Sequence, residues 1–122
     1  MKTSLAILLV VLACALSFAQ PTRSSAGELA GFCRSSDIAS QAFCVGRIEG
    51  YRSVVDELLV LVPDATAQIH IEPTATNGEL ERVFVKYVAD NPETEHKDAF
   101  LVFSFALRST GLMTETKRVG AK

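Results

Sequence analysis

The sequence from residue 38 to residue 62, IASQAFCVGRIEGYRSVVDELLVLV, decides the fold class because its apolar side chains recur at helical spacing. Intervals of 4, 3, 4, 3 and 4 residues separate the members of this set, which are Cys44, Ile48, Tyr51, Val55, Leu58 and Val62. Such intervals place apolar side chains on one side of an α-helix, with charged residues between them. The stretch therefore predicts one helix of roughly seven turns, capped by Ser35, Ser36 or Asp37 and ended by Pro63.

Two glycines interrupt this helix at a cost of about 1 kcal/mol each relative to alanine. Gly46 and Gly50 are four residues apart and so share one helical face. That face allows close approach of another helix of the same chain, which is the interpretation we favour, or of a binding partner. The alternative is that both glycines are tolerated in a helix secured by its packing.

Two further helices follow in the second half of the chain. Thr76-Asn77-Gly78-Glu79 has the form of a capping box and begins a helix with one apolar face. The dipeptide Asn91-Pro92 ends that helix and begins the last one, with Asn91 as cap, and Gly111 is the expected terminator. Together with a helical turn at 28–33, these features predict an all-α fold: a small bundle of three main helices plus a short N-terminal helical turn.

The N-terminal residues have the pattern of a secretory signal peptide. Lys2 precedes an uncharged apolar run, and Ser17-Phe18-Ala19 places small residues before a cleavage point. The run is too short for a membrane span of about 20 residues. Lipidation at Cys14 is the weaker alternative, because Leu12 stands where a smaller residue is usual. We therefore expect a signal peptide at 1–19, a flexible lead-in at 20–27, a helical domain at 28–112 and a loose tail at 113–122.

The length, composition and net charge of the chain limit the kinds of protein it can be. The chain has 122 residues, 48% of them hydrophobic, which suits a single folded domain and excludes wholesale disorder. Its 12 Lys and Arg against 14 Asp and Glu leave a net charge of −2. This balance provides no electrostatic case for binding nucleic acid or an anionic membrane surface.

The predicted export bears on the oxidation state of the two cysteines that remain after signal-peptide cleavage. Cys33 and Cys44 form an even pair in an oxidising compartment, so the expected state is a disulfide. Closing so short a loop contributes on the order of 3 kcal/mol to stability. A metal or redox site is the alternative, but the pair lacks a second pair of soft ligands and is not a CxxC motif.

Residues for catalysis are sparse. The two histidines, His70 and His96, fall in different parts of the chain, and Glu93 or Asp98 beside His96 does not complete a metal site. No serine stands in a GxSxG elbow, and no glycine-rich phosphate loop is present. The sequence therefore predicts a protein without catalytic residues, metal or cofactor.

An ordered set of short motifs resembles the Tai/Rap family of immunity proteins against type VI secretion amidases. The motifs span residues 29 to 108 and are Phe32-Cys33, Phe43-Cys44-Val45-Gly46-Arg47-Ile48-Glu49-Gly50-Tyr51, Pro73, Glu79-Leu80, Lys86-Tyr87, Pro92-Glu93, His96 and Ala106-Leu107. Arg47 stands where the family usually has an aromatic residue, and the family's second cysteine pair is absent.

The resemblance implies a periplasmic, all-helical protein, often a homodimer, that occludes the active site of a peptidoglycan amidase. Loops on rigid scaffolds commonly carry recognition, so the stretch from 64 to 77 is the candidate contact with the partner. Its polar members are Asp64, Gln68, His70, Glu72, Thr74 and Asn77. Within it, Ile69 and Ile71 alternate with polar residues, which suggests a short extended segment rather than a sheet; the alternative is that the stretch is a mere connector.

A general periplasmic stress or chaperone-like module is the competing function. Small helical proteins with a disulfide can expose apolar surface on acidification, and the many carboxylates of this chain respond to pH.

Overall fold

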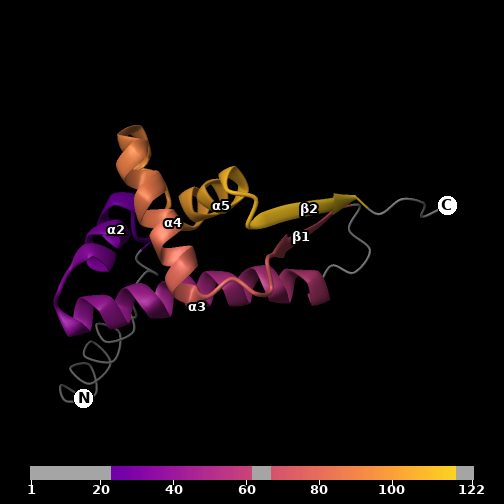
Figure 1. The fold of residues 1–122 in the computed structure, drawn as a ribbon, viewed down its shortest axis with the longest axis horizontal. Helices are drawn as coiled ribbons and strands as arrows, with labels where there is room; N and C mark the ends of the chain where they lie inside the picture. Colours follow the sequence, from indigo (N-terminus) through magenta and orange to yellow (C-terminus); the bar gives the residue numbers. More distant parts are fainter. Residues whose placement is uncertain (1–22, 62–66, 118–122) are drawn as a thin grey trace, which may run out of the picture.

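The computed structural model describes residues 23–61 and 67–117 (Figure 1). Their elements, in chain order, are α2 (Ala26–Arg34), α3 (Ile38–Leu61), β1 (Ala67–Ile71), α4 (Asn77–Asp90), the 3-10 helix η1 (Pro92–Thr94), α5 (Ala99–Ser109) and β2 (Met113–Lys117). The expected signal peptide and Cys14 lie outside the described residues. Within the described ranges, no helix combines the length and the apolar character needed to cross a membrane. The predicted all-α fold is confirmed in part: the described residues are mostly helical, but they also form one two-stranded sheet.

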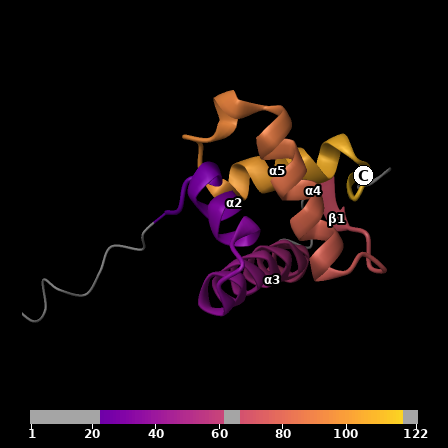
Figure 2. The same ribbon diagram turned by 60° about the vertical axis from the view of Figure 1, so that its left-hand side comes forward.

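Helix α3 is the base of the molecule. It begins directly after Asp37, whose carboxylate accepts hydrogen bonds from the backbone N–H (2.9 Å) and the hydroxyl (3.0 Å) of Ser40. Its 24 residues correspond to a rod of about 36 Å. Helices α2, α4 and α5 lie on one side of this rod in both views (Figures 1 and 2). Of the periodic apolar residues, Cys44, Ile48 and Val55 are buried and Tyr51 is half-buried, as the spacing predicts. Val62 and Pro63 lie outside the described residues.

The core lies where α2, α4 and α5 meet α3. Its largest buried side chains include Leu29, Ile48, Leu80, Phe84 and Phe103. Burial of each contributes about 1.5–3 kcal/mol relative to exposure. The ring of Tyr51 joins α3 to α5, with centroids 5.2 Å from Phe100 and 5.4 Å from Phe103.

Ordered structure begins earlier in the chain than the sequence predicts, within the segment expected to be a flexible lead-in. The Ser25 side chain caps α2 by accepting from the Glu28 N–H, so the helix begins at Ala26 rather than at Glu28. Ser24 is buried, and its carbonyl accepts from the Ala99 N–H at 3.1 Å. The prediction of a flexible segment through residue 27 is therefore wrong for its last residues. Their backbone is held by hydrogen bonds to distant residues, which local composition does not reveal.

The last helix is shorter than the sequence predicts. The Asn91 side chain donates to the Tyr87 carbonyl at 2.8 Å and so closes α4 instead of capping a new helix. Pro92 begins only the 3-10 turn, and α5 starts at Ala99 after Asp98, whose carboxylate accepts from the Leu101 N–H. The turn between them accepts hydrogen bonds from the start of α2, which explains why it does not continue as helix.

A two-stranded antiparallel sheet corrects two further expectations. β1 pairs with β2 from Ala67 opposite Lys117 to Ile71 opposite Met113. Residues 113–117 are thus a strand and not part of a loose tail, and the segment at 67–71 belongs to a sheet. Neither strand is stable alone, since each needs the other's hydrogen bonds from more than 40 residues away. Buried Ile71 and Met113 anchor this ribbon to the core.

Candidate functional site

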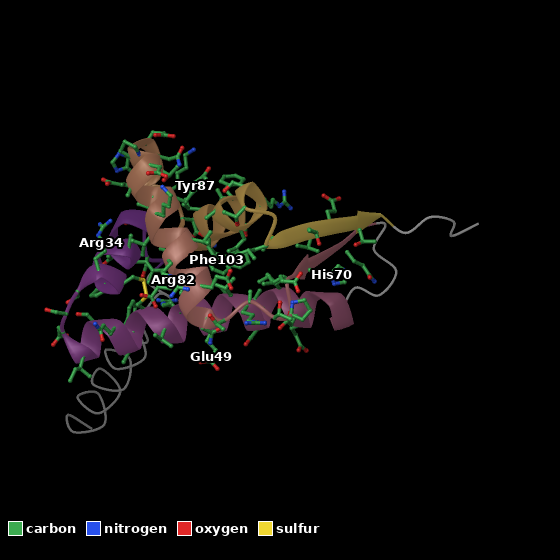
Figure 3. The ribbon with its side chains drawn as sticks, viewed as in Figure 1. Arg34, Glu49, His70, Arg82, Tyr87 and Phe103 are labelled. Atoms are coloured by element: carbon green, nitrogen blue, oxygen red, sulfur yellow. A yellow bond between two sulfur atoms is a disulfide. The ribbon has the colours of Figure 1, made fainter. Side chains whose placement is uncertain are left out.

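The predicted contact loop is in fact strand β1 and an ordered turn that leads into α4. Gln68 and His70 lie on β1 opposite Thr116 and Thr114 of β2, and all four share the face opposite to Ile69 and Ile71. Glu72 and Thr74 follow in the turn and are exposed. Asp64 lies outside the described residues. The ribbon is at the end of the molecule opposite α2, and Figure 3 shows His70 there, far from Arg34.

Asn77 differs from the other predicted contact residues. It is the first residue of α4 and is half-buried. Its Oδ1 atom is buried without a hydrogen-bond partner among the residues that the structure describes. That oxygen cannot contact a partner protein without movement of the helix start, so we leave Asn77 out of the accessible surface.

The turn is fixed to the scaffold by Arg52, a residue outside the predicted contact stretch. The guanidinium of this α3 residue donates to the Ala75 carbonyl at 2.6 Å and to the Pro73 carbonyl at 3.1 Å. Hydrogen bonds from a charged donor are worth about 1.5–3 kcal/mol each. The position of Arg52, four residues after buried Ile48, is the signal in the sequence: it places an arginine at the border of the core-facing side.

Three further hydrogen bonds hold the turn. The Glu72 N–H donates to the Leu112 carbonyl at 2.8 Å, the Ala75 N–H donates to the Glu72 carbonyl, and the Thr74 hydroxyl donates to the Glu72 carboxylate at 3.0 Å. Together with β1 and β2, the turn presents a preformed polar surface. We call Gln68, His70, Glu72, Thr74, Thr114 and Thr116 the ribbon–turn surface.

The two histidines lie on different elements. His70 is on β1, whereas His96 is exposed in the turn between η1 and α5. The structure also shows two shifted titratable groups, and both have structural causes. The Ser40 N–H and hydroxyl hold the pKa of Asp37 below its usual value of 3.8. Burial raises the pKa of Tyr51 above 10.0, although Arg47 opposes the shift. Both pKa shifts are therefore explained by a helix cap and by burial, and neither indicates a catalytic acid–base pair.

The outer face of α3 carries two glycines and several apolar side chains, together with the exposed carboxylates of Glu49 and Glu57. Gly46 and Gly50 are exposed, and an added Cβ at either position meets no atom within 4 Å. The prediction that they face another helix of the same chain is therefore wrong for the described residues. The same helix also carries exposed apolar side chains: Ile38 is 83% exposed, Val54 48% and Phe43 39%.

The predicted disulfide is present. Cys33 at the end of α2 and Cys44 in α3 are joined, with their Cα atoms 5.1 Å apart. The bond (yellow in Figure 3) fixes α2 to the base helix, and α4 passes beside it. A carboxylate oxygen of Glu81 on α4 lies within 4.8 Å of both sulfur atoms.

Comparison of the chain with protein-family models, with curated proteins and with solved structures finds no match. The Tai/Rap resemblance therefore rests on the ordered motifs of the sequence alone.

Proposed function

We propose that this protein is an exported immunity-type protein that binds a cell-wall amidase effector of type VI secretion and occludes its active-site cleft. Support comes from the ordered motifs at 29–108 and, above all, from one structural observation: the Arg52 guanidinium fixes the turn at 73–75 to the base helix. A preformed surface loses little conformational entropy on binding, which favours tight complexes.

The ribbon–turn surface is the proposed contact with the amidase. It combines an imidazole, a carboxylate, an amide and three hydroxyls, so it is able to donate and accept hydrogen bonds in a polar cleft. Occlusion needs no catalytic group on the inhibitor. Its requirement is a shape that stays fixed, and the turn hydrogen bonds and the Cys33–Cys44 bond provide it.

Binding of the amidase by a variant of the ribbon–turn surface tests this proposal. Replacement of Gln68, His70, Glu72 and Thr74 by alanine is expected to weaken affinity by 100-fold or more, because interfaces depend on a few central contacts worth about 2 kcal/mol or more each. The matched control replaces four exposed polar residues elsewhere, Glu28, Glu93, His96 and Lys97, and keeps wild-type affinity. Equal affinities of the two variants would place the contact elsewhere.

We further propose that the outer face of α3 joins two copies of the chain as an antiparallel, two-fold pair. An antiparallel pair centred on position 48 places Phe43 opposite Ser53 and Ala42 opposite Val54 of the other copy, so that each large side chain meets a smaller one, and it places Gly46 opposite Gly50. A two-fold interface requires such self-complementarity. Because one helix face is small against the roughly 800 Å² per partner of a standard interface, we expect a weak dimer.

Sedimentation velocity over a range of concentrations tests the dimer. Gly46→Lys is compatible with an exposed helix position but places a charged chain in the pair, so it is expected to remain monomeric at concentrations where the wild type associates. Ala89→Lys, at an exposed position of α4, is the matched control and associates as the wild type does. A wild-type chain that stays monomeric at millimolar concentration would contradict the pair.

The stress-module alternative predicts a different behaviour of the same exposed apolar side chains. A chain that binds no amidase yet suppresses aggregation of other proteins at pH 3 would support that function in place of immunity.

A further inference from the structure

Three helices meet at the disulfide: α2 and α3 provide the two cysteines, and α4 places the carboxylate of Glu81 beside them. Cys33 lies in the last turn of α2, Cys44 is buried in α3, and Glu81 lies on α4. A carboxylate oxygen of Glu81 and the two sulfur atoms all lie within 4.8 Å of one another. Glu81 is half-buried, and no described residue forms a hydrogen bond or ion pair with its carboxylate.

We propose that in the reduced protein Cys33, Cys44 and Glu81 form a binding site for a thiophilic divalent cation such as Zn²⁺. Two thiolates and one carboxylate are ligands that zinc takes in proteins, and three protein ligands leave the fourth tetrahedral position to water. The site exchanges with the disulfide: the oxidised chain has no thiolate to offer, and the reduced chain has two. It is independent of the amidase-binding function.

The geometry requires only small movements of the ligands. Zinc–sulfur bonds of about 2.3 Å and zinc–oxygen bonds of about 2.1 Å place tetrahedral ligand atoms roughly 3.5–4 Å apart. The Glu81 oxygen, within 4.8 Å of both sulfurs, is already near that range. The two sulfurs have to separate once their bond is broken, which rotation about the Cα–Cβ bonds of the cysteines provides.

The chemistry balances with a dithiol as the reductant. The dithiol passes two electrons and two protons to the Cys33–Cys44 bond and closes to a disulfide itself, so the S–S bond breaks and two thiols form. Cation binding then releases the two thiol protons to solvent. The metal thereby connects α2 and α3 in place of the lost bond, and it also connects them to α4.

Cobalt titration of the full chain tests the site, because cobalt bound to thiolate has a characteristic charge-transfer absorption. A phosphine reductant, which takes the oxygen of one water as it reduces the disulfide, serves here because it competes little for metal. We expect the oxidised chain to show no such absorption and the reduced chain to bind one Co²⁺, displaceable by Zn²⁺. Glu81→Gln is expected to weaken the affinity at least 10-fold, whereas Glu79→Gln, on the same helix, leaves it within about 2-fold.

Two results would overturn the proposal. One is a reduced wild-type chain that shows no thiolate–cobalt absorption at millimolar Co²⁺. The other is a Glu81→Gln variant that binds as tightly as the wild type. Far-ultraviolet circular dichroism covers the case in which reduction unfolds the chain: Zn²⁺ is then expected to restore more helix in the wild type than in Glu81→Gln, and equal recovery also refutes the site.

Discussion

Replacement of the two exposed glycines of α3 by alanine should stabilise the protein. Gly46 and Gly50 lie inside a 24-residue helix, and an added Cβ at either position meets no atom within 4 Å. Alanine therefore fits without strain and recovers its helix propensity, worth about 1 kcal/mol per exposed interior position. The two sites are independent in this respect, so we expect about 2 kcal/mol for the double variant.

Urea unfolding followed by circular dichroism measures this effect, at a protein concentration low enough to keep the chain monomeric. A gain of 1 kcal/mol also raises the melting temperature by roughly 4–8 °C in a domain of this size. Gly27→Ala is the opposite-sign control, because its Cβ would lie 3.1 Å from the Cβ and 3.2 Å from the carbonyl oxygen of Glu95. Loss of stability in Gly46→Ala would mean that this face is packed within one chain, and would refute both the description of α3 and the proposed pair.

Three other substitutions test the fixed elements of the fold. Cys33→Ser or Cys44→Ser is expected to lower the free energy of unfolding by about 3 kcal/mol in urea denaturation. Two free thiols by mass spectrometry in protein purified without reductant would show that no bond forms. Arg52→Met removes two hydrogen bonds from a charged donor while it keeps the aliphatic stem. We expect a loss of about 3 kcal/mol, the lower end of the range for two such bonds, and faster amide exchange in the turn; unchanged exchange there would contradict the anchoring role. The lowered pKa of Asp37 means that its carboxylate stabilises the fold above pH 3.8 and that this contribution is lost as pH falls through the lower, folded-state pKa. Asp37→Asn keeps a capping side chain, so its stability should vary less with pH in this range than that of the wild type; an identical acid titration of the two proteins would argue against the cap.

The helices were predictable because their determinants are local. The period of Cys44, Ile48 and Val55 identifies the buried side of α3, and the Thr76 cap, which accepts from the Glu79 N–H, marks the start of α4. Gly111 adopts φ +76° at the end of α5, a conformation that favours glycine, as its expected role as terminator requires.

The sheet and the start of α5 were not predictable by the same means. β1 and β2 are each five residues long and depend on a partner more than 40 residues away. The Asn91-Pro92 dipeptide has the chemistry of a helix start, but the Asn91 side chain bonds backward to Tyr87 and the backbone of the next turn accepts from α2. The sheet and the start of α5 depend on contacts between residues far apart in the sequence, so a local sequence pattern does not predict them.

The candidate site was likewise predictable only in part: its composition is a local property, whereas its rigidity is not. The stretch that carries Gln68, His70, Glu72 and Thr74 was recognisable as polar and non-helical. Its rigidity was not, because it depends on the Arg52 guanidinium more than 20 residues away in sequence. The approach of Glu81 to the cysteine pair is a tertiary contact of the same kind.

Peptidoglycan cleavage by the cognate amidase, with and without this protein, tests the central claim most directly. The amidase is captured from native envelope extract on the immobilised chain, purified, and assayed for amide hydrolysis. Our account predicts that an equimolar amount of the wild-type chain abolishes hydrolysis and that the ribbon–turn variant leaves most of it intact. Full hydrolysis in the presence of excess wild-type chain would contradict the account.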